Sequence, residues 1–400
     1  MKIAILTTDG REYGHRYEEK EPFFGTAPAA LLQGFAALPE VEVHVVSCAQ
    51  QQMKSIAKLA ENIYFHSLHV PKIGWMRTGF QGCIRAVRGK LREIRPDIVH
   101  GQGTERDCAV SAVFSGHPNV LTIHGNMRLV ARADGARPLT YKWLAARLEH
   151  FTIPRSDGIV CITNYTRDAV ASLARMTWVV PNAVDSTFFE VEHLPSPSVQ
   201  ILCVATVDGR KNQNALIRAV DTLRPQGNFE LVFLGGVKRD NAYGREFLKL
   251  VEARPWCRYA GFADRNALRQ YMASASGLVL PSLEDNCPMV ILEAMAAGVP
   301  VAASRIGGIP ELIRHGETRL LFDPLDESAM AAAMRSLLAI ATPEMAARAR
   351  SEALTRFHPR HIAERHVEIY REVLSQSERR SGESSLELKP SAKKNVGVGV

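Results

Sequence analysis

A single acidic residue stands inside an otherwise apolar helical segment, MVILEAMAA, and that residue is Glu293. A helix that is apolar on all sides is typical of a buried helix, and a lone buried carboxylate is rare unless it has a partner. Pro288 suits the first turn of this helix, Asp285 or Asn286 is a candidate cap, and Gly298 ends it. The segment therefore predicts a buried helix with one carboxylate that needs a partner.

The start of this helix has the properties of an anion site. The first backbone N–H groups, those of Met289 and Val290, have no partner within the helix, and the positive end of the helix dipole lies there. Glu293 is four residues beyond Met289 and so lies on the same face. A pyrophosphate on the amides with ribose hydroxyls on Glu293 fits a nucleotide. A structural ion pair between Glu293 and a buried Arg or Lys is the alternative.

The elements that must position this helix form an α/β pattern. Short apolar stretches such as KIAILTT, VEVHVVS and NVLTIH alternate with helical stretches such as QGCIRAVRGKLREI, and the pattern restarts at VQILCVAT. Strands that are apolar throughout indicate a parallel sheet covered on both faces. We therefore expect two doubly wound, Rossmann-like domains that face each other across a cleft at the carboxyl ends of their strands.

The domain boundaries follow from changes in composition. Pro, Asn and Ser cluster in PNAVDSTFFEVEHLPSPS, which predicts the link between the domains. We expect a first domain over residues 1–182, a second over 183–356, a helix over 357–375 that crosses back to the first domain, and a disordered tail over 376–400.

Composition excludes several classes of protein. With 46% hydrophobic and 23% charged residues the chain is typical of a globular protein, and no apolar run is long enough to span a bilayer. Seven widely spaced cysteines without a CxxC pair favour free thiols in a reducing cytosol over a disulfide framework or a zinc site. Much of the net charge of +7 lies in residues 71–95, a basic region that suits either a solvated helix face or peripheral contact with a membrane.

The segment from Asp285 onward resembles the retaining glycosyltransferases of the GT-B fold, in particular family 4. Two acids separated by seven residues precede AMAAGVPV, and Asp285 and Glu293 have this spacing. The resemblance implies that Asp285 approaches the donor sugar, with Glu284 as the alternative first acid, and that Glu293 binds the ribose.

The resemblance extends over nearly the whole chain to about residue 375. VATVDGRKNQNALIRAV resembles the start of the family's second domain, which implies that Arg210 and Lys211 neutralise the donor diphosphate beside Thr206. YAGFADRNALRQYM resembles the region where the base lies, which implies contacts from Gly261 and Phe262.

In the first domain, His124 follows the strand NVLTI and precedes Gly125, so it is expected at the cleft. The resemblance implies that His124 is the histidine beside the donor sugar. It also implies contacts with donor or acceptor from the loop FFGTAPAALLQGF. We expect Gly25 from that loop to contact the donor. On the acceptor side we expect Thr26 from the same loop, His100 from another strand end and Asn164 from ITNYTRDAV.

The resulting hypothesis is transfer of a sugar from a nucleoside diphosphate sugar to a hydroxyl of a carbohydrate or lipid-linked acceptor, with retention, in surface polysaccharide or glycolipid assembly. No metal, cofactor or nucleic acid is expected, and the location is cytoplasmic, with peripheral contact at the inner membrane face. Two alternatives stay open: a GT-B nucleotide-sugar epimerase and a non-catalytic nucleotide-sugar-binding protein.

Overall fold

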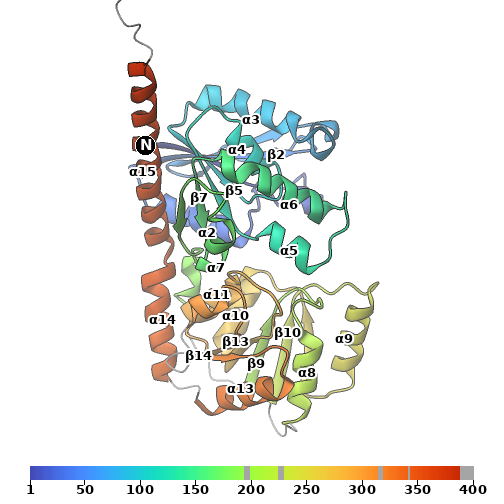
Figure 1. The fold of residues 1–400 in the computed structure, drawn as a ribbon. Helices are drawn as coiled ribbons and strands as arrows, with labels where there is room; N and C mark the ends of the chain where they lie inside the picture. Colours follow the sequence, from blue (N-terminus) through green and yellow to red (C-terminus); the bar gives the residue numbers. More distant parts are fainter. Residues whose placement is uncertain (193–198, 224–228, 314–318, 341–342, 388–400) are drawn as a thin grey trace, which may run out of the picture.

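In the computed structural model the chain forms two α/β domains, each built on its own sheet (Figure 1). The structure describes residues 1–192, 199–223, 229–313, 319–340 and 343–387. The expected fold class, two Rossmann-like domains, is confirmed.

The first sheet has the strand order β3-β4-β2-β1-β5-β6-β7-β8, and its strands are parallel except for the β3–β4 pair. Its hairpin strands β3 and β4 were not expected from the sequence. The strands are β1 Lys2–Leu6, β2 Glu42–Ala49, β3 Lys58–Ala60, β4 Ile63–His69, β5 Ile98–Gln102, β6 Asn119–Ile123, β7 Gly158–Cys161 and β8 Thr177–Val179.

The second sheet is parallel in the order β11-β10-β9-β12-β13-β14. Its middle strands are fully buried, which is why they are apolar throughout. The strands are β9 Val199–Val204, β10 Phe229–Leu234, β11 Cys257–Gly261, β12 Gly277–Leu280, β13 Val301–Ser304 and β14 Arg319–Phe322. The break between the sheets falls between Val179 and Val199, where Pro and Ser cluster.

Helices cover both faces of each sheet, so each domain has a hydrophobic core on either side of its sheet. In the first domain they are α1 Arg11–Gly14, α2 Thr26–Ala36, α3 Gln81–Ile94, α4 Asp107–Val113, α5 Met127–Ala133, α6 Tyr141–Thr152 and α7 Asn164–Val170. In the second they are α8 Gln213–Asp221, α9 Ala242–Glu252, α10 Arg265–Ser274, α11 Met289–Ala297, α12 Ile309–Leu312 and α13 Glu327–Ile340. Short 3-10 turns are η1 Lys72–Gly74, η2 Met76–Thr78, η3 Ile153–Arg155 and η4 Ser186–Phe188.

Two further helices, α14 Pro343–Phe357 and α15 Pro359–Glu387, run along one side of the molecule (Figure 1). α14 packs on α11 of the second domain, and α15 packs on α2 of the first. Gly34 of α2 permits this approach, because a β-carbon there would lie 2.1 Å from the backbone oxygen of Pro359.

The C-terminal helix is longer than the sequence indicated. Residues 376–387 continue α15, where a disordered tail was expected, and residues 388–400 lie outside the described part. Glu and Arg favour helix, and a helix already docked on the first domain extends at little cost because its nucleus exists. A polar composition alone therefore did not identify the end of the helix.

Candidate active site

Helix α11 begins at Met289, and no side chain caps its first turn. The sequence suggested Asp285 or Asn286 as the cap, and this was wrong, because the carboxylate of Asp285 turns to Lys211 and the amide of Asn286 contacts the first domain. No hydrogen bond to the N–H groups of Met289 or Val290 is made within the described residues. The first N–H groups of α11 therefore have no partner among the described residues, which is the condition that an anion site at a helix N-terminus requires.

Glu293 is 5% exposed and makes no hydrogen bond with any residue that the structure describes. Burial raises the pKa of its carboxyl group from 4.5 to about 7, and the charge of Arg265 opposes this only in part. Arg265 itself pairs with the buried Asp185, so it is not a dedicated partner of Glu293. The structural ion pair considered from the sequence is thus absent among these residues, and Glu293 has unused acceptor capacity.

Asp185 and Arg265 were not identified as site residues from the sequence. Asp185 lies in the PNAVD segment between the domains, and Arg265 is the first residue of α10. They come together only through the fold, since 80 residues separate them. The conspicuous acid at the end of PNAVD was the available signal.

Two cations from the loop after β9 face the acids after β12, because β9 and β12 are neighbours in the sheet. Nζ of Lys211 forms an ion pair with Oδ2 of Asp285, which also accepts a hydrogen bond from Oγ of Ser282 at 3.1 Å. Arg210 donates to the backbone oxygen of Glu284 at 3.0 Å and lies 3.4 Å from its carboxylate. The structure therefore brings together all four charged residues proposed for this end of the site.

The loop after β13 packs against the acidic loop, which is residues 281–288 between β12 and α11 and carries Glu284 and Asp285. A β-carbon on Gly307 would lie 1.9 Å from the backbone oxygen of Asp285, and one on Gly308 would lie 2.2 Å from that of Asn286. Gly307 also has a positive φ of 54°, a conformation that favours glycine. Gly307 and Gly308 were not expected at the site from the sequence, although a Gly–Gly pair soon after an apolar strand was the available signal.

The other predicted donor contacts lie along the carboxyl edge of the second sheet. Thr206 follows β9, and Gly261 ends β11 with a φ of 79°. Gly235 sits between them: its N–H donates to the oxygen of Gly261, and a β-carbon on it would lie 2.1 Å from the oxygen of Ala205. Phe262 is 79% exposed beside this edge. At this edge the glycines leave the backbone uncovered by side chains, and the ring of Phe262 is exposed to solvent.

His124 lies at the carboxyl end of β6, as expected from the sequence, and its backbone oxygen accepts a hydrogen bond from Asn286 of the second domain at 3.2 Å. Its Nε2 is 2.8 Å from Oε1 of Gln102. Burial lowers the pKa of His124 to about 4, and a hydrogen bond with Asn182 opposes this only in part. The imidazole is therefore neutral near pH 7.

Asn164, expected on the acceptor side, contacts the other domain. Its side-chain amide donates to Glu311 of α12 at 2.8 Å, and the N–H groups of Asn164 and Tyr165 donate to the same carboxylate at 2.6 and 2.7 Å. An acid at the start of a helix suits these free amides. The amide of Asn164 is therefore already engaged in joining the domains.

His100 is not at the cleft. The strand β5 continues to Gln102, so His100 lies within it and is fully buried. Its ring nitrogens are 2.6 Å from the hydroxyl of Tyr370 on α15 and 2.7 Å from that of Thr122. The sequence suggested a strand end because the apolar run stops before His100.

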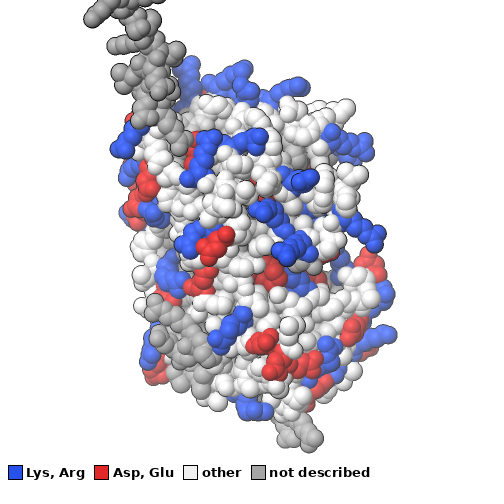
Figure 2. Space-filling view, in the orientation of Figure 1, with Lys and Arg blue, Asp and Glu red and all other residues white. Residues whose placement is uncertain are grey.

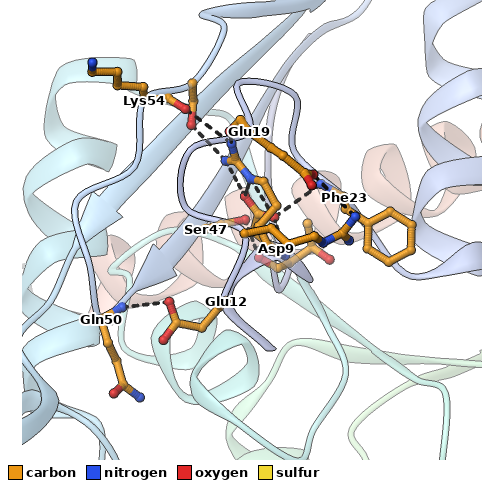
Figure 3. A network of polar contacts seen from close by, with 11 residues as sticks. Asp9, Glu12, Glu19, Phe23, Ser47, Gln50 and Lys54 are labelled. Atoms are coloured by element: carbon orange, nitrogen blue, oxygen red, sulfur yellow. Dashed lines mark hydrogen bonds and ion pairs between the residues drawn. The ribbon is translucent and has the colours of Figure 1, made fainter. Parts of the chain in front are cut away.

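Gly25 and Thr26 lie at the start of α2, where no side chain caps the helix. The loop that leads to them is fixed by a buried ion pair between Asp9, labelled in Figure 3, and Arg11, both with side chains 0% exposed. Asp9 also accepts the N–H of Phe23 at 3.2 Å. The first loop is thus held rigidly against the sheet.

Among the described residues, one group has side chains close enough to hold a metal ion, namely Cys48, Cys83 and Asp107. All three are buried in the first domain, away from the acids of the second. None of the described helices is long and apolar enough to cross a membrane.

Solved structures with this arrangement are GT-B glycosyltransferases. Sucrose-phosphate synthase from Thermosynechococcus elongatus superposes with a TM-score of 0.76 at 19% identity, covering 94% of this chain and 100% of that one. A structure of Anabaena HepE in complex with UDP-glucose gives 0.68 at 17% identity, with coverage of 94% and 100%. At these identities the likeness shows the fold alone.

Two family models match consecutive parts of the sequence. "Glycosyltransferase Family 4" covers residues 29–188, and "Glycosyl transferases group 1" covers residues 198–339. The chain therefore belongs to the GT-B glycosyltransferases of the group 1, family 4-like kind.

Curated relatives agree with this class. Alpha-maltose-1-phosphate synthase from Mycolicibacterium smegmatis is 28% identical over 299 residues, which is 66% of this chain and 75% of that protein. Glycogen synthase from Mycobacterium tuberculosis is 26% identical over 259 residues, 62% of each chain.

The buried carboxyl group predicts a pH-dependent stability. The pKa of the Glu293 carboxyl group is about 4.5 in the unfolded chain and about 7 in the folded protein. Between these two pH values the folded protein therefore holds a proton that the unfolded chain has released. The free energy of unfolding therefore falls as pH rises through this window, by up to about 3 kcal/mol, and then levels off. Glu293→Gln removes this contribution and should become more stable than the parent as pH rises to 8.

Urea unfolding at pH 5, 6, 7 and 8 measures this difference. The exposed Glu246→Gln is the matched control and should follow the parent at every pH. A stability difference between Glu293→Gln and the parent that does not change with pH would contradict the assigned pKa.

Proposed function

We propose that this glycosyltransferase moves a sugar from a nucleoside diphosphate sugar to a hydroxyl of a carbohydrate or lipid-linked acceptor, with retention at the anomeric carbon. Surface polysaccharide or glycolipid assembly is the proposed setting. The observation that carries the proposal is the uncapped N-terminus of α11 with the unpartnered carboxyl of Glu293 one turn further on.

The residues divide between the parts of the donor. The amides of Met289 and Val290 and the cations Arg210 and Lys211 bind the diphosphate, because fixed N–H groups and cations stabilise charge on a departing anion. Glu293 accepts the ribose hydroxyls. The structures of HepE with UDP and with UDP-glucose support a donor of this kind.

Binding of the diphosphate rearranges the charges at the sugar end. Lys211 is paired with Asp285 in the structure. When the phosphates take over Lys211, the carboxylate of Asp285 becomes free to accept sugar hydroxyls beside the neutral His124. Glu284 remains the alternative first acid, since it precedes Asp285 in the loop after β12 and its carboxylate contacts Arg210 from the loop after β9.

No metal or cofactor enters this mechanism. The cations Arg210 and Lys211 supply the positive charge that the leaving diphosphate needs, and that diphosphate takes the proton of the attacking hydroxyl. Closure of the two domains would exclude water from the donor.

The direct test follows release of nucleotide from a panel of nucleoside diphosphate sugars, with and without an acceptor-containing cell extract. We expect release that depends on the extract. Release without any acceptor, with a changed sugar, would instead indicate an epimerase, and binding without turnover would indicate a non-catalytic protein.

Lys211→Ala should lower turnover by roughly tenfold to hundredfold, the scale of one or two charge-assisted hydrogen bonds. Lys249→Ala, at an exposed position on α9, is the matched control and should keep parental turnover. Full turnover in Lys211→Ala would exclude Lys211 from the diphosphate site.

We also propose a cytoplasmic location with peripheral contact at the inner membrane face through residues 71–95. Lys and Arg gather over α3 at the end of the first domain (Figure 2), and Ile73 beside them is 75% exposed. The apolar side of α3 packs on the sheet, and its basic side faces outward. A cationic surface with an exposed apolar residue suits an anionic bilayer.

The protein should co-sediment with vesicles of anionic phospholipid at low salt and dissociate as salt is raised. Reversal of Arg85 and Arg88 to Glu should abolish this binding, because each basic residue near the surface contributes about 1 kcal/mol. The same reversal of the exposed Arg360 and Arg371 on α15 is the control. Absence of binding at low salt would refute the membrane contact.

A further inference from the structure

The first domain carries an aromatic pocket that none of the roles assigned above uses. The cavity measures about 250 Å³, and its walls include Tyr13, Trp75, Arg106 and Tyr141. This is close to the lower end of the range for small-molecule pockets, roughly 300–1,000 Å³, which suits a single ring.

The pocket lies at the carboxyl edge of the first sheet, the edge that also carries His124. Tyr13 follows β1, Gln50 follows β2, Trp75 follows β4 and Arg106 follows β5. These strands are parallel neighbours, so their carboxyl ends meet at one edge, where ligands of such sheets bind.

The walls of the pocket are fixed in place. The carboxylate of Glu12 accepts the N–H of Gln50 at 3.1 Å, which ties the loop of Tyr13 to the end of β2 (Figure 3). The buried Asp9–Arg11 pair anchors the same loop. Trp75 is 5% exposed and its indole N–H donates to the oxygen of Val70 at 2.8 Å. The cavity is therefore preorganised.

Arg106 stands in the pocket, and most of its N–H donors have no partner in the part of the chain that the structure describes. Its guanidinium lies 4.8 Å from the ring centre of Tyr13 and 5.2 Å from that of Trp75. Its hydrogen bond is to the hydroxyl of Tyr13. The charges of Glu105 and Asp107 interact with that of Arg106, yet neither carboxylate forms a salt bridge with it within the described residues. A guanidinium has five N–H donors, so an anionic ligand has a planar partner here.

Two aromatic rings of the pocket remain open to solvent. Tyr13 is 63% exposed and Tyr141 is 47% exposed. Rings of this kind present an apolar body and a polar tip, which matches a sugar with an apolar face and hydroxyl edges.

We propose that this pocket is an acceptor subsite for a sugar that bears an anionic group. The sugar ring packs against Tyr13 and Tyr141, and its carboxylate or phosphate accepts hydrogen bonds from Arg106. This inference rests on the proposed function, since it names the substrate class of the acceptor side.

The test compares four probes by ligand-observed NMR titration: glucuronate, glucose 6-phosphate, methyl glucoside and inorganic phosphate. We expect at least one anionic sugar to bind fivefold or more tightly than methyl glucoside, and more tightly than phosphate alone. The carboxylate and phosphate probes separate the two sources of negative charge.

Three variants locate the binding. Arg106→Gln should remove the preference for the anionic sugar, and Tyr13→Ala should weaken it at least threefold at a position exposed enough to leave folding intact. Arg371→Gln, on the exposed side of α15, should behave as the parent. Equal binding of neutral and anionic sugars, parental binding by Arg106→Gln, or phosphate binding as tight as that of the sugar phosphate would overturn the proposal.

Calorimetric measurement of the binding of UDP, GDP and ADP distinguishes failure of the proposed function from failure of the proposed acceptor subsite. All three variants should bind a nucleoside diphosphate as the parent does, which also shows that they are folded. Anionic-sugar binding without nucleotide binding would defeat the proposed function and leave the subsite, while the reverse result would defeat the subsite alone.

Discussion

The carboxyl group of Glu293 is buried within an apolar helix, and no hydrogen bond from the described residues satisfies it. Such a group costs stability, because burial disfavours its charged form. Helix α11 nevertheless holds it one turn from an N-terminus that is equally unsatisfied. The free amides of the helix N-terminus call for an anion, and the carboxylate of Glu293 calls for hydrogen-bond donors. One ligand with an anionic group and neighbouring hydroxyls would satisfy both. The loops after β9, β12 and β13 all meet near this end of α11.

Those loops are held by contacts from both domains. Asn286 links the acidic loop to the backbone of His124, and Glu311 accepts three N–H donors at the start of α7. Gly307 and Gly308 allow the β13 loop to press against the acidic loop from the other side. The first domain therefore contacts this loop directly, and the hydrogen bond from Asn286 brings the backbone of His124 beside it.

Local patterns in the sequence were sufficient for the fold class and for helix α11, but not for the β3–β4 hairpin or for the end of α15. Apolar strands alternating with helices define both sheets, and the lone acid in MVILEAMAA identified Glu293. The sequence did not reveal which way a side chain turns when competing partners exist. Asp285 was read as a helix cap but pairs with Lys211, 74 residues away, and Asn164 was read as a ligand contact but pairs with Glu311. His100 was predicted at a strand end, and this was wrong because β5 extends three residues beyond its apolar run.

The role of Glu293 is tested most directly by measuring the pKa of its carboxyl group with carbon-detected NMR. The signal is assigned by comparison with Glu293→Gln, and the pKa is measured in the free protein and in the complex with a nucleoside diphosphate. We expect a pKa of about 7 in the free protein. In the complex we expect this pKa to fall by at least one unit, because ribose hydroxyls donate to the charged form. A value near 4.5 in the free protein, or no change when the nucleotide is demonstrably bound, would contradict the central role given to Glu293.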